Sequence, residues 1–576
     1  MRAPLSALLL LAAAACASCS APGFVPGHVP VASGSIFPSV ACPTLAGRTI
    51  PADAIGLPSG NAVITSAAYV PAAGALAEGT SYTAASPEHC RVVGRIAPVD
   101  KAAQDIQFQV NLPSSWNGKA VQYGGGGYNG TLVTGLAPLR DAAPDDAPPL
   151  TRGYVTLGTD SGHQAASFAP NAIGQFGLND EMLANYAFAS YKKVRDVAVA
   201  VMRTYYGRKP ARIYYFGGSE GGREGLTMAQ RFPADYDGVV SVVPVVQLSM
   251  LFQSYIPRSV PQFEGGWLSP AKVRTLASYV AQRCDALDGL ADGVVNNYLA
   301  CPRQVDLRAL RCTGGADTGD NCLSDAQIAV VDSVHRPYNF PFPLANGRQV
   351  YPGWFYGNET TPDPVLPTMT RWATGAAVPT EPPDARSAAQ YWLYGSNYVK
   401  YFVVRDGNFD VRTYRPENFR PRLEQVSAIL DSSNPDLSAF FARGGKLILR
   451  ENMGDLAQSP QAGIDYFQAV RAKLGDAAVE RSMRLYISPA STHSGPAASV
   501  TTGAPVATMV DLLEPLDRWV TLDDAPYDAL VQVSRLPVPP FTLQASRPMC
   551  RYPAYPHFIG GDPAAASSYQ CRESRP

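Results

Sequence analysis

A serine in a glycine-rich turn is the residue of this chain whose surroundings best suit chemistry. The pentapeptide from Gly217 to Gly221 reads GGSEG and fits the pattern G-x-S-x-G, with the apolar run RIYYF before it and the helical pattern REGLTMAQRF after it. Small residues allow a tight strand-to-helix turn, which exposes the serine hydroxyl near the positive end of the helix. The pattern predicts that Ser219 is a nucleophile; a plain glycine-rich turn is the alternative interpretation.

Such a serine needs a base, because its hydroxyl is a poor nucleophile until its proton is removed. The order along the chain for this motif is serine, then acid, then histidine, and the histidines after Ser219 are His335, His493 and His557. His493 comes a short loop after the apolar run RLYIS, where a catalytic histidine belongs. His335 lies in an irregular region and His557 in a proline-rich tail, so we expect structural roles for both.

Asp455 is the best candidate for the acid that orients the histidine. It follows the apolar run KLILR within five residues and precedes His493 by 38 residues, which leaves room for one helix and one strand. A solvated turn aspartate is the alternative interpretation. Asp160, in TDSGH, is a rival only if the chain order is broken, and a turn role fits it better.

Acyl transfer also needs two N–H donors for the negatively charged oxygen of its tetrahedral intermediate. The backbone N–H of Glu220, directly after the serine, is expected to be one. The second should come from a loop after an earlier strand, and the glycines at 124–127 allow a close approach because they have no Cβ. We choose Gly127; a flexible glycine hairpin is the alternative.

An acidic loop, CDALDGLADGVVNNYLAC, runs from Cys284 to Cys301. Its aspartates Asp285, Asp288 and Asp292 could bind one hard cation, and calcium fits better than zinc because the candidate ligands are oxygens. A solvated acidic turn is equally compatible with the spacing. Any such ion would be structural and distant from Ser219, and nothing in the sequence indicates an organic cofactor.

Strand and helix patterns alternate from about residue 90, which predicts the α/β class with a parallel sheet flanked by helices. Between 248 and 434 the alternation gives way to irregular spacing rich in proline and aromatic residues. We therefore expect an α/β-hydrolase domain in two parts, 42–247 and 435–576, with a large inserted lid domain at 248–434.

The first residues predict export. Arg2 precedes an apolar run and then small residues, which is typical of a signal peptide over residues 1–20. Cys16 or Cys19 could instead carry a lipid, so a periplasmic, a secreted and an outer-membrane lipoprotein location all remain open. No later apolar stretch reaches the roughly 20 residues of a transmembrane helix. The formal net charge of -1 argues against nucleic acid as a partner.

Eight cysteines follow the signal region, and an even number in an exported chain indicates disulfides. Near neighbours suggest three pairs and elimination suggests the fourth, although sequence alone leaves the connectivity open: Cys284 with Cys301, Cys312 with Cys322, Cys550 with Cys571, and Cys42 with Cys90.

From about residue 42 onward the chain resembles the tannase and feruloyl esterase family of α/β-hydrolases. The likeness is most specific in GSEGGREGLTMAQRFPADYDGVV, in the acidic loop, in GGGGYNG and in the pair Cys550 and Cys571. The resemblance implies the same serine, acid, histidine and N–H donors, a lid over an aromatic acid, and the same four disulfides. It also implies calcium bound by a set of five residues: Asp285, Asp288, the Leu290 carbonyl, Asp292 and the Val294 carbonyl.

Two positions depart from the family. Its members typically join a cysteine before the nucleophile to one after the histidine, and this chain has Gly218 and Ser494 there. We therefore expect a more mobile histidine loop. Family members that hydrolyse terephthalate monoesters hold the free carboxylate with a lid arginine, whereas the matching stretch 391–401 has none, so Arg386 or Lys400 would have to substitute.

These observations predict an exported serine hydrolase for a small-molecule ester of an aromatic acid, working through an acyl-enzyme. Feruloyl, galloyl and terephthalate-monoester substrates are not distinguished. A non-catalytic exported protein that binds aromatic ligands on the same fold is the alternative.

Overall fold

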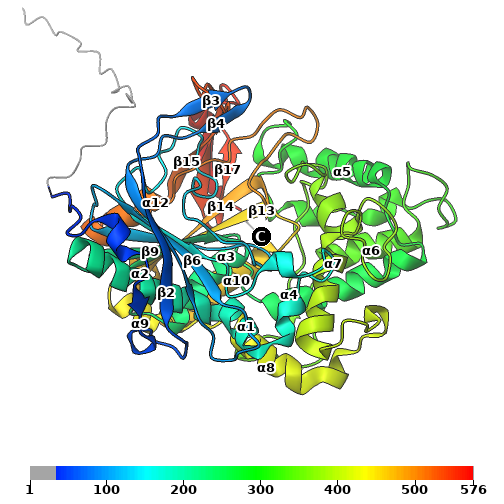
Figure 1. Cartoon of the computed structure of the whole chain (residues 1–576). Coiled ribbons are helices and arrows are strands. Elements are labelled where there is room, and N and C mark those ends of the chain that lie inside the picture. Colours follow the sequence, from blue (N-terminus) through cyan, green and yellow to red (C-terminus); the bar gives the residue numbers. More distant parts are fainter. Residues whose placement is uncertain (1–33, 575–576) are drawn as a thin grey trace, which may run out of the picture.

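A single large β-sheet organises the computed structural model, which describes residues 34–574 (Figure 1). The predicted signal sequence, with Cys16 and Cys19, lies outside the described residues. The 12 strands of the sheet follow one another in space in this order: β1 (Thr49–Ile50), β2 (Ala62–Val70), β5 (His89–Ile96), β6 (Ile106–Pro113), β8 (Val155–Thr159), β7 (Lys119–Tyr123), β9 (Arg212–Gly218), β10 (Gly238–Val242), β13 (Lys446–Gly454), β14 (Met483–Thr492), β16 (Leu543–Arg551) and β15 (Ala529–Arg535).

The middle of the sheet, from β8 to β14, is parallel, and its outer strands pair antiparallel. The alternation of strands and helices predicted the parallel part. The outer strands β1, β2, β5 and β6 differ because no α-helix separates them in the chain, and a parallel connection needs a crossover. β10 and β13 are buried along their whole length, which explains their continuous apolar runs.

Helices cover both faces of the parallel strands. On one face Val239, Leu447 and Leu449 belong to a core shared with α2, α3 and α10, and on the other Val240 and Ile448 pack with α12. No helix between residues 34 and 574 is long and apolar enough to cross a membrane. The helices have these bounds: α1 (Asp180–Ala184), α2 (Ser190–Tyr206), α3 (Glu220–Arg231), α4 (Leu248–Ser259), α5 (Pro270–Cys284), α6 (Asp325–His335), α7 (Gln390–Asn397), α8 (Arg420–Leu430), α9 (Ser438–Ala442), α10 (Pro460–Leu474), α11 (Asp476–Ser482) and α12 (Leu513–Leu522).

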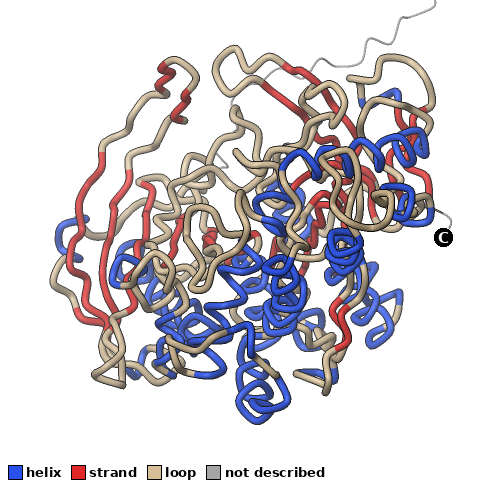
Figure 2. The backbone as a smooth tube through the Cα atoms, turned by 90° about the vertical axis from the view of Figure 1, so that its right-hand side faces the viewer, coloured by secondary structure: helices blue, strands red, loops and turns tan. Residues whose placement is uncertain are grey.

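The chain leaves the sheet after β10 and returns to it with β13, and the predicted lid, 248–434, falls within this excursion. Helices α4 to α8 lie beside the sheet, green to yellow on the right and at the bottom of Figure 1. α4 contacts α7 and α8 within a second core rich in aromatic side chains. Figure 2 shows many helices in the lower part of the molecule, a further group at the upper right, and long loops in the centre. Three two-stranded sheets complete the fold: β3 (Leu76–Glu78) with β4 (Ser81–Thr83), β11 (Tyr338–Asn339) with β12 (Val350–Tyr351), and β17 (Ala554–Phe558) with β18 (Tyr569–Glu573).

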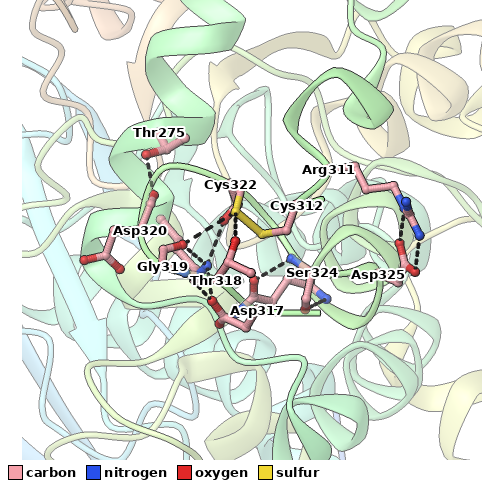
Figure 3. Close-up of a disulfide and its surroundings, with 12 residues drawn as sticks. Thr275, Arg311, Cys312, Asp317, Thr318, Gly319, Asp320, Cys322, Ser324 and Asp325 are labelled. Carbon is pink, nitrogen blue, oxygen red and sulfur yellow. Dashed lines mark hydrogen bonds and ion pairs between the residues drawn. A yellow bond between two sulfur atoms is a disulfide. The ribbon is translucent and has the colours of Figure 1, made fainter. Parts of the chain in front are cut away.

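Within residues 34–574, four disulfides confirm the expected pairs, three suggested by spacing and Cys42–Cys90 by elimination: Cys42–Cys90, Cys284–Cys301, Cys312–Cys322 and Cys550–Cys571. The Cys312–Cys322 bond closes a loop of the insertion (Figure 3). The buried ammonium of Lys272 binds this loop, at 3.0 Å from Asp317 Oδ1 and 2.7 Å from the carbonyl oxygens of Gly319 and Cys322. A side-chain cation therefore satisfies the backbone acceptors that the tight loop turns inward.

Candidate active site

Ser219 occupies the turn between β9 and α3 in a backbone conformation that residues with a side chain rarely adopt. Its φ is 61° and its ψ is -123°. The amide N–H of Ser219 donates to the Val242 carbonyl at 2.9 Å, which ties the turn to β10. A Cβ added to Gly217 would lie 2.9 Å from the Cα of Gly221. The turn therefore closes only around glycines and holds the serine in a strained position.

The structure brings the three predicted side chains together. Nε2 of His493 lies 2.9 Å from Ser219 Oγ, and Nδ1 of the same ring lies 2.7 Å from Asp455 Oδ2. A carboxylate only accepts, so Nδ1–H donates to Asp455 and Nε2 is left to accept the serine proton. Ser219 follows β9, Asp455 follows β13 and His493 follows β14. The carboxyl ends of these parallel strands meet at one edge of the sheet, where ligands of such folds bind.

Asp455 is fully buried, and backbone donors fix its carboxylate. Its Oδ1 accepts the amide N–H groups of Ala457 at 2.7 Å and Gln458 at 3.1 Å, which leaves Oδ2 for the imidazole. The buried charge is therefore matched by donors, as a carboxylate in a low-dielectric interior requires.

A second buried carboxylate, Asp363 of the insertion, holds the loop that carries His493. Its Oδ1 accepts the amide N–H of Ser494 at 2.9 Å, and its Oδ2 accepts the indole N–H of Trp372 at 2.6 Å. Burial acts to raise the pKa of Asp363, but the nearby His493 ring and these donors outweigh it and hold that pKa below its ordinary value. Asp363 was not predicted from the sequence, since nothing in its local sequence marks it.

The predicted oxyanion donors lie on two segments in close contact. A Cβ on Gly221 of α3 would lie only 2.7 Å from the Gly125 carbonyl oxygen, so the glycine loop rests directly on the start of the helix. Glu220 is the first residue of α3, where amide N–H groups have no acceptor within the helix. Gly127 has a φ of 58°, and its carbonyl accepts the Tyr186 hydroxyl at 3.0 Å.

Glu224, a fully buried residue of α3 that the sequence analysis also missed, anchors the glycine loop. Its Oε2 accepts the Gly125 amide at 2.9 Å and the Tyr215 hydroxyl at 2.6 Å. Its Oε1 accepts the Asn129 amide group at 2.8 Å and the Tyr191 hydroxyl at 2.6 Å. Four donors on one carboxylate fix the loop that carries Gly127 relative to the helix that carries Glu220.

The residues considered as alternatives to Asp455 and His493 have other surroundings within residues 34–574. Asp160 Oδ1 accepts the amides of Gln107 at 3.0 Å and Gly162 at 2.9 Å, which is a turn role. His335 stacks on Tyr356 with ring centroids 3.5 Å apart. His557 belongs to β17.

Aromatic side chains of the insertion border the site. The Trp372 ring meets the His493 ring edge to face at a centroid distance of 5.1 Å. The centroid of the Tyr394 ring lies 6.3 Å from that of Trp372. A Cβ on Gly127 would lie 2.7 Å from the Tyr394 hydroxyl, so this tyrosine faces the glycine loop.

The two residues considered as substitutes for a lid arginine have other surroundings. Lys400 is buried and paired with Glu381 at 2.6 Å, whereas Arg386 is exposed. Arg371 lies closer to the site, with Nη1 3.2 Å from Ser494 Oγ and the guanidinium over the Trp372 ring. Arg371 was not predicted from the sequence, because it lies before the stretch 391–401 that matches the family's lid arginine.

In the acidic loop the three aspartates bind amide groups of their own segment. Asp285 accepts the amides of Asp292 and Gly293 at 3.1 and 2.9 Å, and Asp292 pairs with Arg547 at 3.0 Å. Asp288 is fully buried, and burial raises its pKa to about 7. Within residues 34–574 no group of three or more His, Cys, Asp or Glu side chains is arranged to hold a metal ion. The Leu290 and Val294 carbonyls belong to the same loop, so its candidate donors are all oxygens.

A mostly parallel sheet with helices on both faces and a serine in a strand-to-helix turn at its carboxyl edge defines an α/β-hydrolase. The model of the family described as tannase and feruloyl esterase matches residues 90–572. The chain belongs to this family and is a carboxylic ester hydrolase.

Similar proteins support this assignment. An uncharacterized esterase of Agrobacterium fabrum is 36% identical, covering 84% of this chain and 86% of the relative. The mono(2-hydroxyethyl) terephthalate hydrolase of Piscinibacter sakaiensis is 31% identical, covering 85% and 86%. The crystal structure of feruloyl esterase B from Aspergillus oryzae has the same fold, with a TM-score of 0.71 at 22% identity, covering 89% of this chain and 97% of that one.

The anchoring of the glycine loop generates a first prediction. Glu224→Gln replaces an acceptor oxygen by an NH₂ group that must face N–H or O–H donors, so the loop should shift. We expect kcat for ester hydrolysis to fall by roughly tenfold or more and the free energy of unfolding to fall by about 1–3 kcal/mol. Steady-state kinetics and urea denaturation measure the two effects. Glu264→Gln, at an exposed carboxylate, is the matched control, and equal kcat in both variants would contradict the role of Glu224.

Proposed function

We propose that this protein is an exported serine esterase that hydrolyses carboxylic esters of aromatic acids through an acyl-enzyme. The observation that carries the proposal is the continuous chain of hydrogen bonds from Ser219 Oγ through the His493 ring to Asp455. The same geometry activates serine in unrelated hydrolases because the roles depend on the distances between the three groups.

The steps follow from the positions of the donors and acceptors. Ser219 Oγ attacks the ester carbonyl while Nε2 of His493 takes its proton, and the Asp455 carboxylate stabilises the imidazolium. The amide N–H groups of Gly127 and Glu220 stabilise the oxyanion. The intermediate collapses, His493 protonates the departing alcohol, and the acyl group stays on Ser219. Water activated by His493 then releases the acid and restores the hydroxyl.

An aromatic acyl group fits the border of the site. Trp372 and Tyr394 offer ring faces and edges next to His493 and Gly127, and aromatic pairs of this kind favour a planar ring in the substrate. The family and the terephthalate-ester hydrolase among the relatives support the same class.

The proposed nucleophile gives a second prediction. Mixing the enzyme with a p-nitrophenyl ester should release a burst of p-nitrophenol, and Ser219→Ala should abolish the burst and lower kcat by roughly 10⁵-fold or more.

Across ferulate, gallate, terephthalate-monoester and simple alkyl esters, kcat/KM should be highest for an ester of an aromatic acid. Ser219→Ala that still hydrolyses the ester, or a wild-type protein that only binds aromatic acids without turnover, would contradict the proposal.

We further propose that the acidic loop binds a structural calcium ion. Asp285, Asp288 and Asp292 supply carboxylate oxygens, and the Cys284–Cys301 bond closes the loop around them. The Leu290 and Val294 carbonyls would complete an oxygen donor set of the kind calcium prefers. The fully buried Asp288, whose partners are neutral N–H groups, supports the presence of a cation.

Metal removal tests this site. After treatment with EDTA, added CaCl₂ should raise the Tm, because a ligand at 100 times its Kd stabilises the folded state by about 2.7 kcal/mol. Asp288→Asn should lose this response, while Asp53→Asn, at an exposed carboxylate, should keep it. An unchanged Tm of the wild-type protein with and without calcium would contradict the site.

We also propose export through the signal sequence, with lipid attachment at Cys16 or Cys19 as the alternative to ordinary cleavage. The four disulfides support an oxidising compartment. Cell fractionation and mass determination of the mature N-terminus test the proposal: we expect cleavage before or near residue 21, with or without a lipid mass on a cysteine, and an uncleaved protein in the cytoplasmic fraction would overturn it.

A further inference from the structure

One guanidinium group lies between the nucleophile turn and the histidine loop. Arg140 belongs to the loop between β7 and β8, and its Nη2 donates a hydrogen bond to the backbone carbonyl of His493. The same side chain lies against Gly218, where an added Cβ would be 2.6 Å from Nη1 and 2.7 Å from Nε. The lack of a side chain at position 218 therefore leaves the space that the Arg140 side chain fills, and a larger residue there would have to displace it.

A small charge network supports the position of this guanidinium. The Asp141 carboxylate lies 4.0 Å from Nε of Arg140 and 3.2 Å from Nη1 of Arg450, a fully buried residue of β13. The Asp141 carbonyl accepts the Val510 amide at 2.7 Å. One carboxylate thus lies between two cations, and the backbone beside Arg140 is itself anchored.

The histidine loop is held from two sides. The Asp363 carboxylate of the insertion binds the Ser494 amide at 2.9 Å, and Arg140 binds the His493 carbonyl from the β7–β8 loop. The His493 ring lies between these contacts and must keep its hydrogen bonds to Ser219 and Asp455. A small displacement of the ring would therefore lower the rate of catalysis.

We propose that Arg140 is a positioning residue that fixes His493 against the nucleophile turn without a covalent bond. Arg140 contacts both Gly218, the residue before the nucleophile, and the histidine loop. In the family a disulfide typically joins these two segments, and this chain has Gly218 and Ser494 in place of its cysteines. The proposal rests on the proposed function of Ser219 and His493, and it gives a reason for the glycine at position 218.

Kinetics of four variants test this proposal. Arg140→Ala should lower kcat for a p-nitrophenyl ester by roughly 10- to 100-fold and leave KM within about twofold, since the base moves while the lid contacts remain. Arg152→Ala is the matched control, because Arg152 lies in the same loop but pairs with Asp511. Gly218→Ala should reproduce the loss by displacing Arg140. In the double variant Arg140→Ala, Gly218→Ala the two losses should not add, because they remove the same contact.

Added guanidinium chloride, well below denaturing concentration, should restore part of the kcat of Arg140→Ala and none of that of Ser219→Ala. An unchanged kcat in Arg140→Ala, additive losses in the double variant, or an equal loss in Arg152→Ala would each overturn the proposal. Full activity of Ser219→Ala would instead refute the proposed function, so the two failures are distinguishable. If Arg140→Ala does not fold, Gly218→Ala alone decides, since an unchanged kcat there overturns the inference.

Discussion

The structure depends on bringing one hydroxyl, one imidazole and one carboxylate within hydrogen-bond distance of each other. Ser219 and His493 are 274 residues apart in the chain, and Ser219 Oγ and His493 Nε2 are 2.9 Å apart in space. The parallel sheet makes this possible because all of its strands point their carboxyl ends to the same edge. β10 and β13 pair directly, so the large excursion between them leaves the sheet and returns to a neighbouring strand.

Buried carboxylates, each matched by N–H or O–H donors, provide the rigidity around these groups. Asp455 orients the imidazole, Asp363 holds the loop that follows it, and Glu224 fixes the glycine loop to α3. In a low-dielectric interior a satisfied charge strongly favours one arrangement, and an unsatisfied one is costly. The site is thus positioned by the interior of the sheet and the insertion together, and Arg140 adds a contact from a third segment.

The sequence predicted the parts of the site that follow buried strands. Ser219, Asp455 and His493 each come after an apolar run, and motif and chain order were enough to choose them. Asp363, Glu224 and Arg140 could not be found in this way, because their partners are distant: Asp363 and Ser494 are separated by 131 residues, and Arg140 and His493 by 353. Likewise, the parallel part of the sheet was readable from its alternation with helices, whereas the antiparallel outer strands depend on connections that lack a helix.

The role of Ser219 as nucleophile is tested most directly by the mass of the covalent intermediate. The enzyme is quenched in acid during turnover of an aryl ester, digested, and its peptides are mapped by mass spectrometry. We expect the added mass of one acyl group on the peptide that contains Ser219. An acyl group on another residue would contradict this role of Ser219. So would a substrate that shows a burst and rapid turnover but leaves Ser219 unmodified in every quenched sample.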